Sequence, residues 1–204
     1  EVRDLRVKSP RGPLAVDGVS LDVREGEIYG VAGVEGNGQS ELVRAIAEGA
    51  DIASGGVFLG GQDFSRWSVR KRRDQGIAHI PEDRQKYGLL LSFSLAQNLA
   101  LGRHHRRPFT TRIGTVNNRA IRESARGIVR QFDIRTPSEE TPAHALSGGN
   151  QQKAVVAREL SGEPRLLLAS QPTRGVDIGA TEFIHRQLVR ARTEGKAVLL
   201  VANT

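Results

Sequence analysis

Hydrophobic residues follow three patterns along the chain, and each pattern predicts a kind of element. Near the N-terminal end they alternate with polar residues, which predicts edge strands with the apolar positions Leu14, Val16, Val19, Leu21 and Val23. An apolar run over 28–32 then leads into a glycine-rich loop, and from Gln39 the apolar residues take helical spacing. Strand, loop and helix in this order open an α/β unit.

The same patterns predict α/β structure as far as the C-terminal end. The continuous apolar run Leu166–Ala169 is typical of a strand buried on both faces, as parallel sheets require. The predicted strands are 76–80, 166–169 and 197–202, and the predicted helices are 117–133, one that opens at Ser147, and 179–193. We expect a single domain over 1–204, truncated at its C-terminal end, with an α/β core over 1–83 and 161–204 and a helical part over 84–160.

Composition narrows the class of protein. With 38% hydrophobic and 26% charged residues, the chain is typical of soluble globular proteins. No apolar run approaches the ~18–20 residues that span a bilayer, and the mixed charges at the N-terminus are unlike a signal peptide. The chain has no cysteine, which excludes disulfides, thiolate chemistry and cysteine-bound zinc.

The net charge of +7 comes mostly from arginine. Basic residues cluster at Arg70–Arg73 and at His104–Arg107. A basic surface can serve nucleic acid or anionic lipid headgroups, but basic residues are also scattered through the rest of the chain. We therefore favour a solvated surface as the reason for the charge.

A glycine-rich loop follows the apolar run over 28–32. Its sequence fits the phosphate-binding pattern G-x-x-x-x-G-K-[ST] except that Gln39 stands in the lysine position. Glycines let the backbone wrap around phosphates, and the free amides of the helix start attract anions. The alternative is a β–α turn without a chemical role. The candidate nucleotide-binding residues are Gly33, Gly36, Asn37, Gly38, Gln39, Ser40 and Glu41.

A second motif, Leu-Ser-Gly-Gly-Asn-Gln-Gln-Lys over 146–153, resembles the signature sequence of the ABC ATPases. Ser147 caps a predicted helix start that carries two glycines, which suits an anion. The resemblance implies that this anion is the γ-phosphate of a nucleotide held by a partner domain. The candidate residues are Leu146, Ser147, Gly148, Gly149, Asn150 and Gln151.

The segment 165–177 looks like the Walker B strand and D-loop of the same family. Ser170 and Gln171 stand where the family has Asp and Glu, and Asp177 keeps the D-loop position. The sequence Ile-Pro-Glu-Asp-Arg over 80–84 lies where the family has its Q-loop. There, Glu82 and the stretch 89–99 are implied contacts with the membrane domain. These finer features resemble the second ATP-binding domain of bacterial nucleoside importers. The related sugar importers are the second possibility.

The resemblance implies an ABC-type P-loop fold: a mostly parallel core sheet flanked by helices, an antiparallel β edge and an inserted helical subdomain. ATP and Mg²⁺ are the implied cofactors. The implied partners are a second nucleotide-binding domain, transmembrane permease subunits and, indirectly, a substrate-binding lipoprotein or periplasmic protein, with no nucleic acid. The implied location is the cytoplasmic face of the cell membrane.

The substitutions weaken the chain's own site. Gln39 carries no charge for the phosphates, and Ser40 has only Ser170 as a partner for Mg²⁺, which prefers carboxylates. Gln171 cannot accept a proton as a carboxylate does, and loss of a general base costs ~10²–10⁴ in rate. We expect weak or absent ATP and Mg²⁺ binding at this site and little ATPase activity from the isolated domain.

Three functions follow from these motifs. The one we favour is an ATP-binding domain of a nucleoside or sugar importer whose signature motif completes the partner's ATP site. The alternatives are a regulatory module that binds nucleotide without hydrolysis, and a soluble ABC protein that acts on ribosomes or nucleic acid.

Overall fold

The computed structural model describes residues 1–9 and 12–203. The chain divides into two compact units. The first unit comprises Glu1–His79, Pro164–Gln171 and Leu188–Thr204, and the second comprises Ile80–Glu163 and Pro172–Gln187. The second unit thus includes 172–187, although the hydrophobic pattern predicts these residues in the α/β core.

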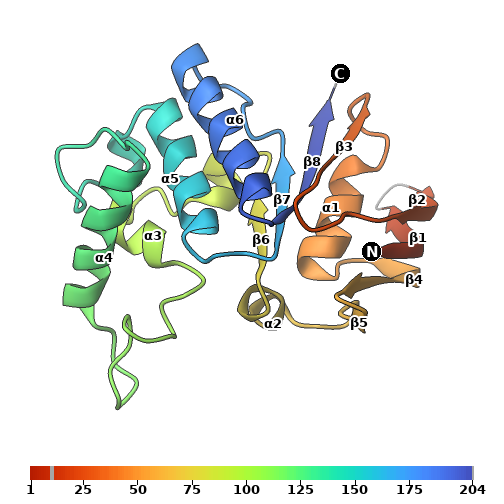
Figure 1. The fold of residues 1–204 in the computed structure, drawn as a ribbon, viewed down its shortest axis with the longest axis horizontal. Coiled ribbons are helices and arrows are strands. Elements are labelled where there is room, and N and C mark those ends of the chain that lie inside the picture. Colours follow the sequence, from red (N-terminus) through yellow and green to blue (C-terminus); the bar gives the residue numbers. More distant parts are fainter. Residues whose placement is uncertain (10–11, 204) are drawn as a thin grey trace. The chain divides into compact units, whose positions relative to one another are not determined.

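An antiparallel sheet opens the first unit (Figure 1). Its strand order is β2-β1-β4-β5, formed by β2 (Gly12–Leu21), β1 (Val2–Ser9), β4 (Ile52–Leu59) and β5 (Gln62–Asp63). β1 was not predicted because its apolar residues do not alternate. The pairing register shifts between Val2 and Leu5, and the intervening Asp4 has a φ of 41°. This bulge keeps both apolar side chains buried at a spacing of three residues.

The second sheet has the order β3-β8-β7-β6. It consists of β3 (Ile28–Gly33), β8 (Ala197–Asn203), β7 (Leu166–Ser170) and β6 (Ile77–Ile80). β8 pairs in parallel with both β3 and β7. Leu167, Leu168 and Ala169 are fully buried, which confirms the prediction of a strand covered on both faces.

Helix α1 (Gln39–Glu48) joins the two sheets of the first unit into one core. Its buried residues Leu42, Val43 and Ile46 belong to one hydrophobic cluster with Leu5 of β1 and Leu199 of β8. α1 follows the glycine-rich loop directly, so its packing fixes the position of that loop. The short helix α2 (Val69–Asp74) lies between β5 and β6 in the chain.

The second unit is helical. It contains η1 (Arg84–Gly88), α3 (Leu95–Ala100), α4 (Asn118–Gln131), η2 (Ala143–Ala145), α5 (Gly148–Leu160) and the first part of α6 (Ile178–Thr193). α4 buries Ile121, Ala125 and Ile128 on one face, as its sequence pattern predicts. In the described ranges, no helix has the length and apolar character required to cross a membrane.

Candidate functional site

The glycine-rich loop of the first unit runs from the end of β3 to the start of α1. Gly36 and Gly38 both have positive φ, 93° and 92°, which favours glycine. At Gly38 a Cβ would also lie 2.2 Å from the carbonyl oxygen of Ala15 on β2. Gly38 is the N-cap of α1, and no side chain caps this helix start. The first-turn amides therefore form a backbone cradle suited to an anion.

The Gln39 side chain lies within this loop. Its Nε2 donates a 3.0 Å hydrogen bond to the carbonyl oxygen of Val34, and only 9% of the residue is exposed. The same nitrogen lies 2.6 Å from where a Cβ of Gly33 would be, so the glycine at the start of the loop makes room for the amide. Gln39 thus bonds to the loop itself and brings no positive charge to a phosphate.

A cavity of about 480 Å³ lies beside the loop in the first unit. Asn37 and Gly38 of the loop and Gln39 and Leu42 of α1 form one wall, and strands β2 and β3 form the rest. The residues from those strands are Ala15, Val16, Asp17, Val19, Ser20 and Leu21 of β2, and Tyr29, Gly30, Val31 and Ala32 of β3. The volume is of the size that small-ligand pockets have.

Strand β7 ends at Ser170, in the position where a carboxylate was expected by resemblance. Ser170 is 7% exposed, and its Oγ has no hydrogen-bond partner. Gln171 follows with a φ of 43°. Its backbone N–H donates a 2.8 Å hydrogen bond to the carbonyl oxygen of Val201 on β8. Glutamine rarely adopts this left-handed conformation, so the turn after β7 is strained.

These residues do not fit a resident Mg²⁺. The ion prefers several oxygen ligands with at least one carboxylate, whereas Ser40 and Ser170 offer hydroxyls. Over 1–9 and 12–203, His, Cys, Asp and Glu side chains form no group of three or more that could hold a metal ion. Ser170 is an orphaned hydroxyl in a buried place that suits a hydrogen-bond donor better than a cation.

The start of α5 in the second unit carries the signature-like motif. Ser147 is exposed and caps the helix, with Asn150 donating to its Oγ from the backbone at 3.4 Å and from Nδ2 at 2.9 Å. The Oδ1 of Asn150 accepts a 2.8 Å bond from the amide of Arg135. Asn150 therefore fixes the hydroxyl that stands at the helix start, where the amides attract an anion.

The two glycines of the motif differ in their surroundings. A Cβ on Gly149 would lie 2.7 Å from Oδ2 of Asp177 and 3.2 Å from Cβ of Ala180. The other carboxylate oxygen of Asp177 accepts a 2.8 Å bond from the amide of Ala180 in the first turn of α6. Gly149 is therefore required for the close approach of α6, and within this chain Asp177 acts as a helix cap.

Other signature residues support the fold of the second unit. Leu146 is 7% exposed and Gln151 is 3% exposed. Gln151 donates from Nε2 to Ala143 at 3.0 Å and accepts a 3.1 Å bond from Gln85 of η1. Lys153 donates 2.7 and 2.8 Å bonds to the carbonyl and carboxylate of Asp133, and this contact lowers the pKa of that carboxyl. Of this motif, Ser147 is exposed and Gly148 and Asn150 are partly exposed at the helix start.

Arg84 and Arg174 were not among the predicted site residues, yet they connect the predicted segments. Glu82 forms an ion pair with Arg174. Arg84 donates to the carbonyl oxygens of Arg174 and Gly175 at 2.9 and 3.1 Å, and its guanidinium lies 2.9 Å from where a Cβ of Gly148 would be. The segment after β6, the segment before Asp177 and the start of α5 are thus held together inside one unit.

Known proteins share both sequence and fold with this chain. A family model described as "ABC transporter" matches residues 16–174. The chain is 47% identical over 202 residues to the nucleoside import ATP-binding protein NupA of Lactococcus lactis, covering 99% of this chain and 40% of that protein. It is 45% identical over 198 residues to the guanosine import ATP-binding protein NupO of Bacillus subtilis, covering 97% of this chain and 39% of that protein.

A sugar importer and solved structures are also similar. The glucose import ATP-binding protein TsgD13 of Haloferax volcanii is 40% identical over 202 residues, covering 98% of this chain and 36% of that protein. The chain therefore spans two fifths or less of the length of these relatives. The dimeric ATP-binding cassette MJ0796 bound to ADP and phosphate has the same fold, with a TM-score of 0.82 at 24% identity, covering 98% of this chain and 86% of that one. Proteins of the ABC transporter family typically bind ATP and Mg²⁺. This chain belongs to the ABC transporter family.

Proposed function

We propose that this chain is an ATP-binding domain of an importer for nucleosides, and that it completes an ATP site on a second nucleotide-binding domain. The observation that carries this proposal is the contrast between its two anion-binding helix starts. Ser147 stands exposed at the start of α5, whereas Gln39 at the start of α1 bonds to its own loop. The first suits a phosphate from outside the chain, and the second lacks the charge for its own.

The chain's own site has little or no hydrolytic activity on this proposal. Gln171 can orient a water but cannot take its proton, and the hydroxyl of Ser170 replaces a metal carboxylate. Each of these substitutions weakens a different part of catalysis, so their effects combine. Nucleotide still has a place to bind, because the amides of the loop and the neighbouring cavity remain.

The importer function rests on the relatives, whose names specify nucleoside, guanosine and glucose import. We favour nucleosides because the two relatives at 45–47% identity are a nucleoside and a guanosine importer protein. The partners are then permease subunits, a second nucleotide-binding domain and, through the permease, a substrate-binding protein. The chain would act at the cytoplasmic face of the cell membrane, with Glu82 and 89–99 toward the permease.

Transport by the full-length protein tests the substrate. The protein is reconstituted with its permease and substrate-binding protein in proteoliposomes, and ATP-dependent uptake of labelled guanosine, glucose and ribose is compared. We expect uptake of guanosine alone. Uptake of a sugar instead would correct the substrate class, and ATP hydrolysis without any uptake would contradict the importer function.

Substitution of Gln39 tests the role of the chain's own site. Gln39→Ala in the full-length protein removes the bond to Val34 but no charge. We expect ATP turnover by the reconstituted transporter to change by less than about twofold. Gln39 carries no positive charge, so its removal takes away no electrostatic stabilisation of a phosphate. A loss of more than tenfold would show that this loop works in catalysis. Gln39→Lys, which restores the family residue, serves as the companion variant and should tighten ATP binding.

A further inference from the structure

A basic hairpin projects from the second unit between α3 and α4 (Figure 1). We name residues 106–117 the arginine hairpin. Thr110 bridges to Val116, the amide of Thr111 donates to the Thr115 carbonyl at 2.8 Å, and the amide of Asn117 donates to the Phe109 carbonyl at 2.8 Å. These bonds across the hairpin hold it in a defined shape.

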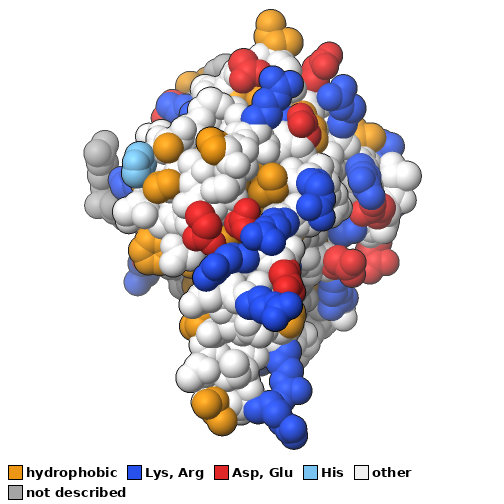
Figure 2. All heavy atoms as spheres, turned by 90° about the vertical axis from the view of Figure 1, so that its left-hand side faces the viewer, with side chains coloured by type: hydrophobic (Ala, Val, Ile, Leu, Met, Phe, Trp, Pro, Cys, Tyr) orange, Lys and Arg blue, Asp and Glu red, His pale blue; other side chains and the backbone are white. Residues whose placement is uncertain are grey.

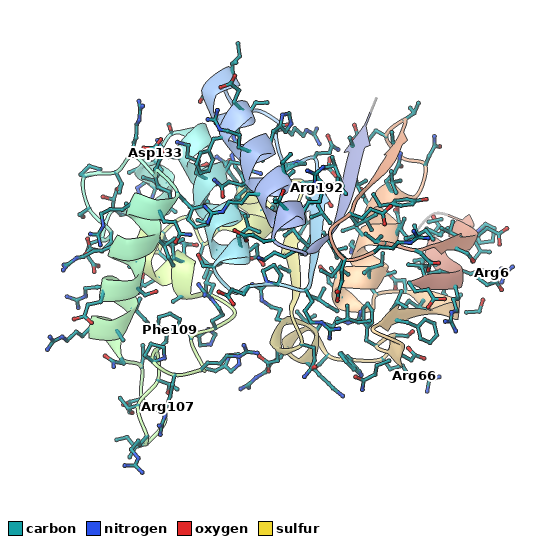
Figure 3. The ribbon with its side chains drawn as sticks, viewed as in Figure 1. Arg6, Arg66, Arg107, Phe109, Asp133 and Arg192 are labelled. Atoms are coloured by element: carbon teal, nitrogen blue, oxygen red, sulfur yellow. The ribbon has the colours of Figure 1, made fainter. Side chains whose placement is uncertain are left out.

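Phe109 anchors the hairpin to the helical unit. It is 6% exposed, and the guanidinium carbon of Arg103 lies 5.8 Å from its ring centroid. Figure 3 shows Phe109 at the base of the hairpin and Arg107 farther along it, with the arginine directed away from the helices. The anchor and the cross-hairpin bonds fix the direction in which the tip points.

The tip combines an exposed apolar side chain with arginines. Ile113 is 86% exposed and Val116 is 56% exposed, and Arg107 and Arg112 of the same hairpin are exposed as well. The lowest part of the face in Figure 2 shows basic and apolar side chains next to one another. The exposed isoleucine in this glycine-containing turn contributes nothing to the core, and it is available for contact with a partner outside the chain.

The charge of the hairpin is not balanced by its own segment. No acidic residue occurs in the sequence between Asp83 and Glu123. On α4, by contrast, Arg119, Arg122 and Arg126 form ion pairs with Glu123, Glu140 and Glu139. Positive charge is therefore concentrated at the hairpin, rather than spread evenly over the helical unit.

We propose that the arginine hairpin docks on an anionic phospholipid surface. Guanidinium groups bind lipid phosphates through paired hydrogen bonds, and an exposed isoleucine at a narrow tip can enter the boundary between headgroups and acyl chains. A nucleic-acid surface fits less well, because binding of single strands uses exposed aromatic side chains and the aromatic residue of this hairpin is buried. The docking goes beyond the proposed import function and requires neither nucleotide nor permease.

Vesicle binding by the full-length protein tests this inference. The purified protein is sedimented with vesicles of phosphatidylcholine alone or mixed with phosphatidylglycerol, without ATP or permease. We expect binding to the anionic vesicles only, and binding weaker by at least about 30-fold for the double variant Arg107→Glu/Arg112→Glu, since each arginine usually contributes about 1 kcal/mol at such a surface and each glutamate is repelled by it. Ile113→Ser should weaken binding about threefold, and this part of the loss should persist at high salt.

The matched control is Arg66→Glu/Arg70→Glu in the first unit. These two arginines are also exposed, and the change in net charge is the same. We expect their reversal to alter vesicle binding less than twofold. Equal losses for the two double variants would mean that net charge alone attracts the protein, and no binding of the native protein to anionic vesicles would be equally decisive against the proposal.

Two other partners are distinguished by parallel measurements. If polyuridylate binds the protein and the hairpin reversal abolishes only that binding, the hairpin is a nucleic-acid surface and the proposal is wrong. The proposal is also wrong if the reversal leaves vesicle binding intact but prevents assembly with the permease in detergent. Because no outcome depends on transport, a failure here is separate from a failure of the proposed import function.

Discussion

Ser147→Arg in the full-length protein is expected to lower the ATP turnover of the reconstituted transporter by about 100-fold, the cost of losing an anion-stabilising group at a catalytic site. The exposed hydroxyl lies at the start of α5, where the helix amides point toward an incoming anion. A bulky side chain at this position projects over the helix start and blocks access to it. Its long side chain faces solvent and displaces no core residue.

Ser68→Arg is the matched control for this experiment. Ser68 is also an exposed N-cap, and it accepts a 3.3 Å bond from the amide of Lys71, compared with 3.4 Å for the equivalent bond at Ser147. Each variant loses one helix cap, which costs about 1 kcal/mol. We expect Ser68→Arg to retain turnover within about twofold, since this helix start carries no signature motif. Equal turnover for the native protein and Ser147→Arg would contradict the signature-donor function.

The glycines of the signature motif are poorer choices for this test. A side chain at Gly149 would collide with Asp177, which caps α6, and with Ala180. Loss of activity in a Gly149 variant would therefore report damage to the packing of α5 against α6 inside the chain. The distinction between Gly149 and Ser147 is structural, because both belong to one motif in the sequence.

Much of the architecture follows from hydrophobic periodicity. The runs around Val31, Leu167 and Leu199 predict strands β3, β7 and β8, of which β7 and β8 are mostly buried, and the one-sided pattern of α4 predicts its packing face. Hydrophobic periodicity does not predict β1 or α3, and the reasons are physical. A bulge at Asp4 breaks the alternation of β1, and α3 spans only Leu95–Ala100, too short for a helical period to stand out.

The candidate sites are also only partly predictable from the sequence. Spacing alone predicts the glycine loop as a phosphate-binding loop, because the backbone that cradles an anion requires glycines and a serine at these positions. The spacing of residues cannot show that the side-chain amide of Gln39 donates to the carbonyl of Val34, or that Arg84 donates to the carbonyls of Arg174 and Gly175. Such contacts depend on side-chain directions between segments far apart in the sequence. The proximity of Glu82 to Arg174 is a further example.

The position of the glycine loop depends on a buried arginine that no motif predicts. Arg72 of α2 is 0% exposed, and it donates three hydrogen bonds, to the carbonyls of Ile46, Ser65 and Trp67 at 2.7, 2.7 and 2.9 Å. Burial lowers the pKa of its guanidinium. The bond to Ile46 places a cation at the C-terminal end of α1, whose own last turn contains no basic residue. That position favours a positive charge.

Arg72→Met is expected to destabilise the first unit by at least about 3 kcal/mol, because the buried carbonyl group of Ile46 and the half-buried carbonyl groups of Ser65 and Trp67 lose a charged donor at once. Methionine preserves much of the side-chain volume, so the loss reports hydrogen bonds more than packing. Arg70→Met on the same helix is the control, and its exposed side chain should contribute less than about 0.5 kcal/mol. Hydrogen exchange of the α1 amides in the full-length protein measures both variants, and unchanged protection in Arg72→Met would rule out this anchoring role. Because α1 carries the loop at its start, the same variant should weaken nucleotide binding at that loop even though Arg72 bonds only to backbone at the opposite end of the helix.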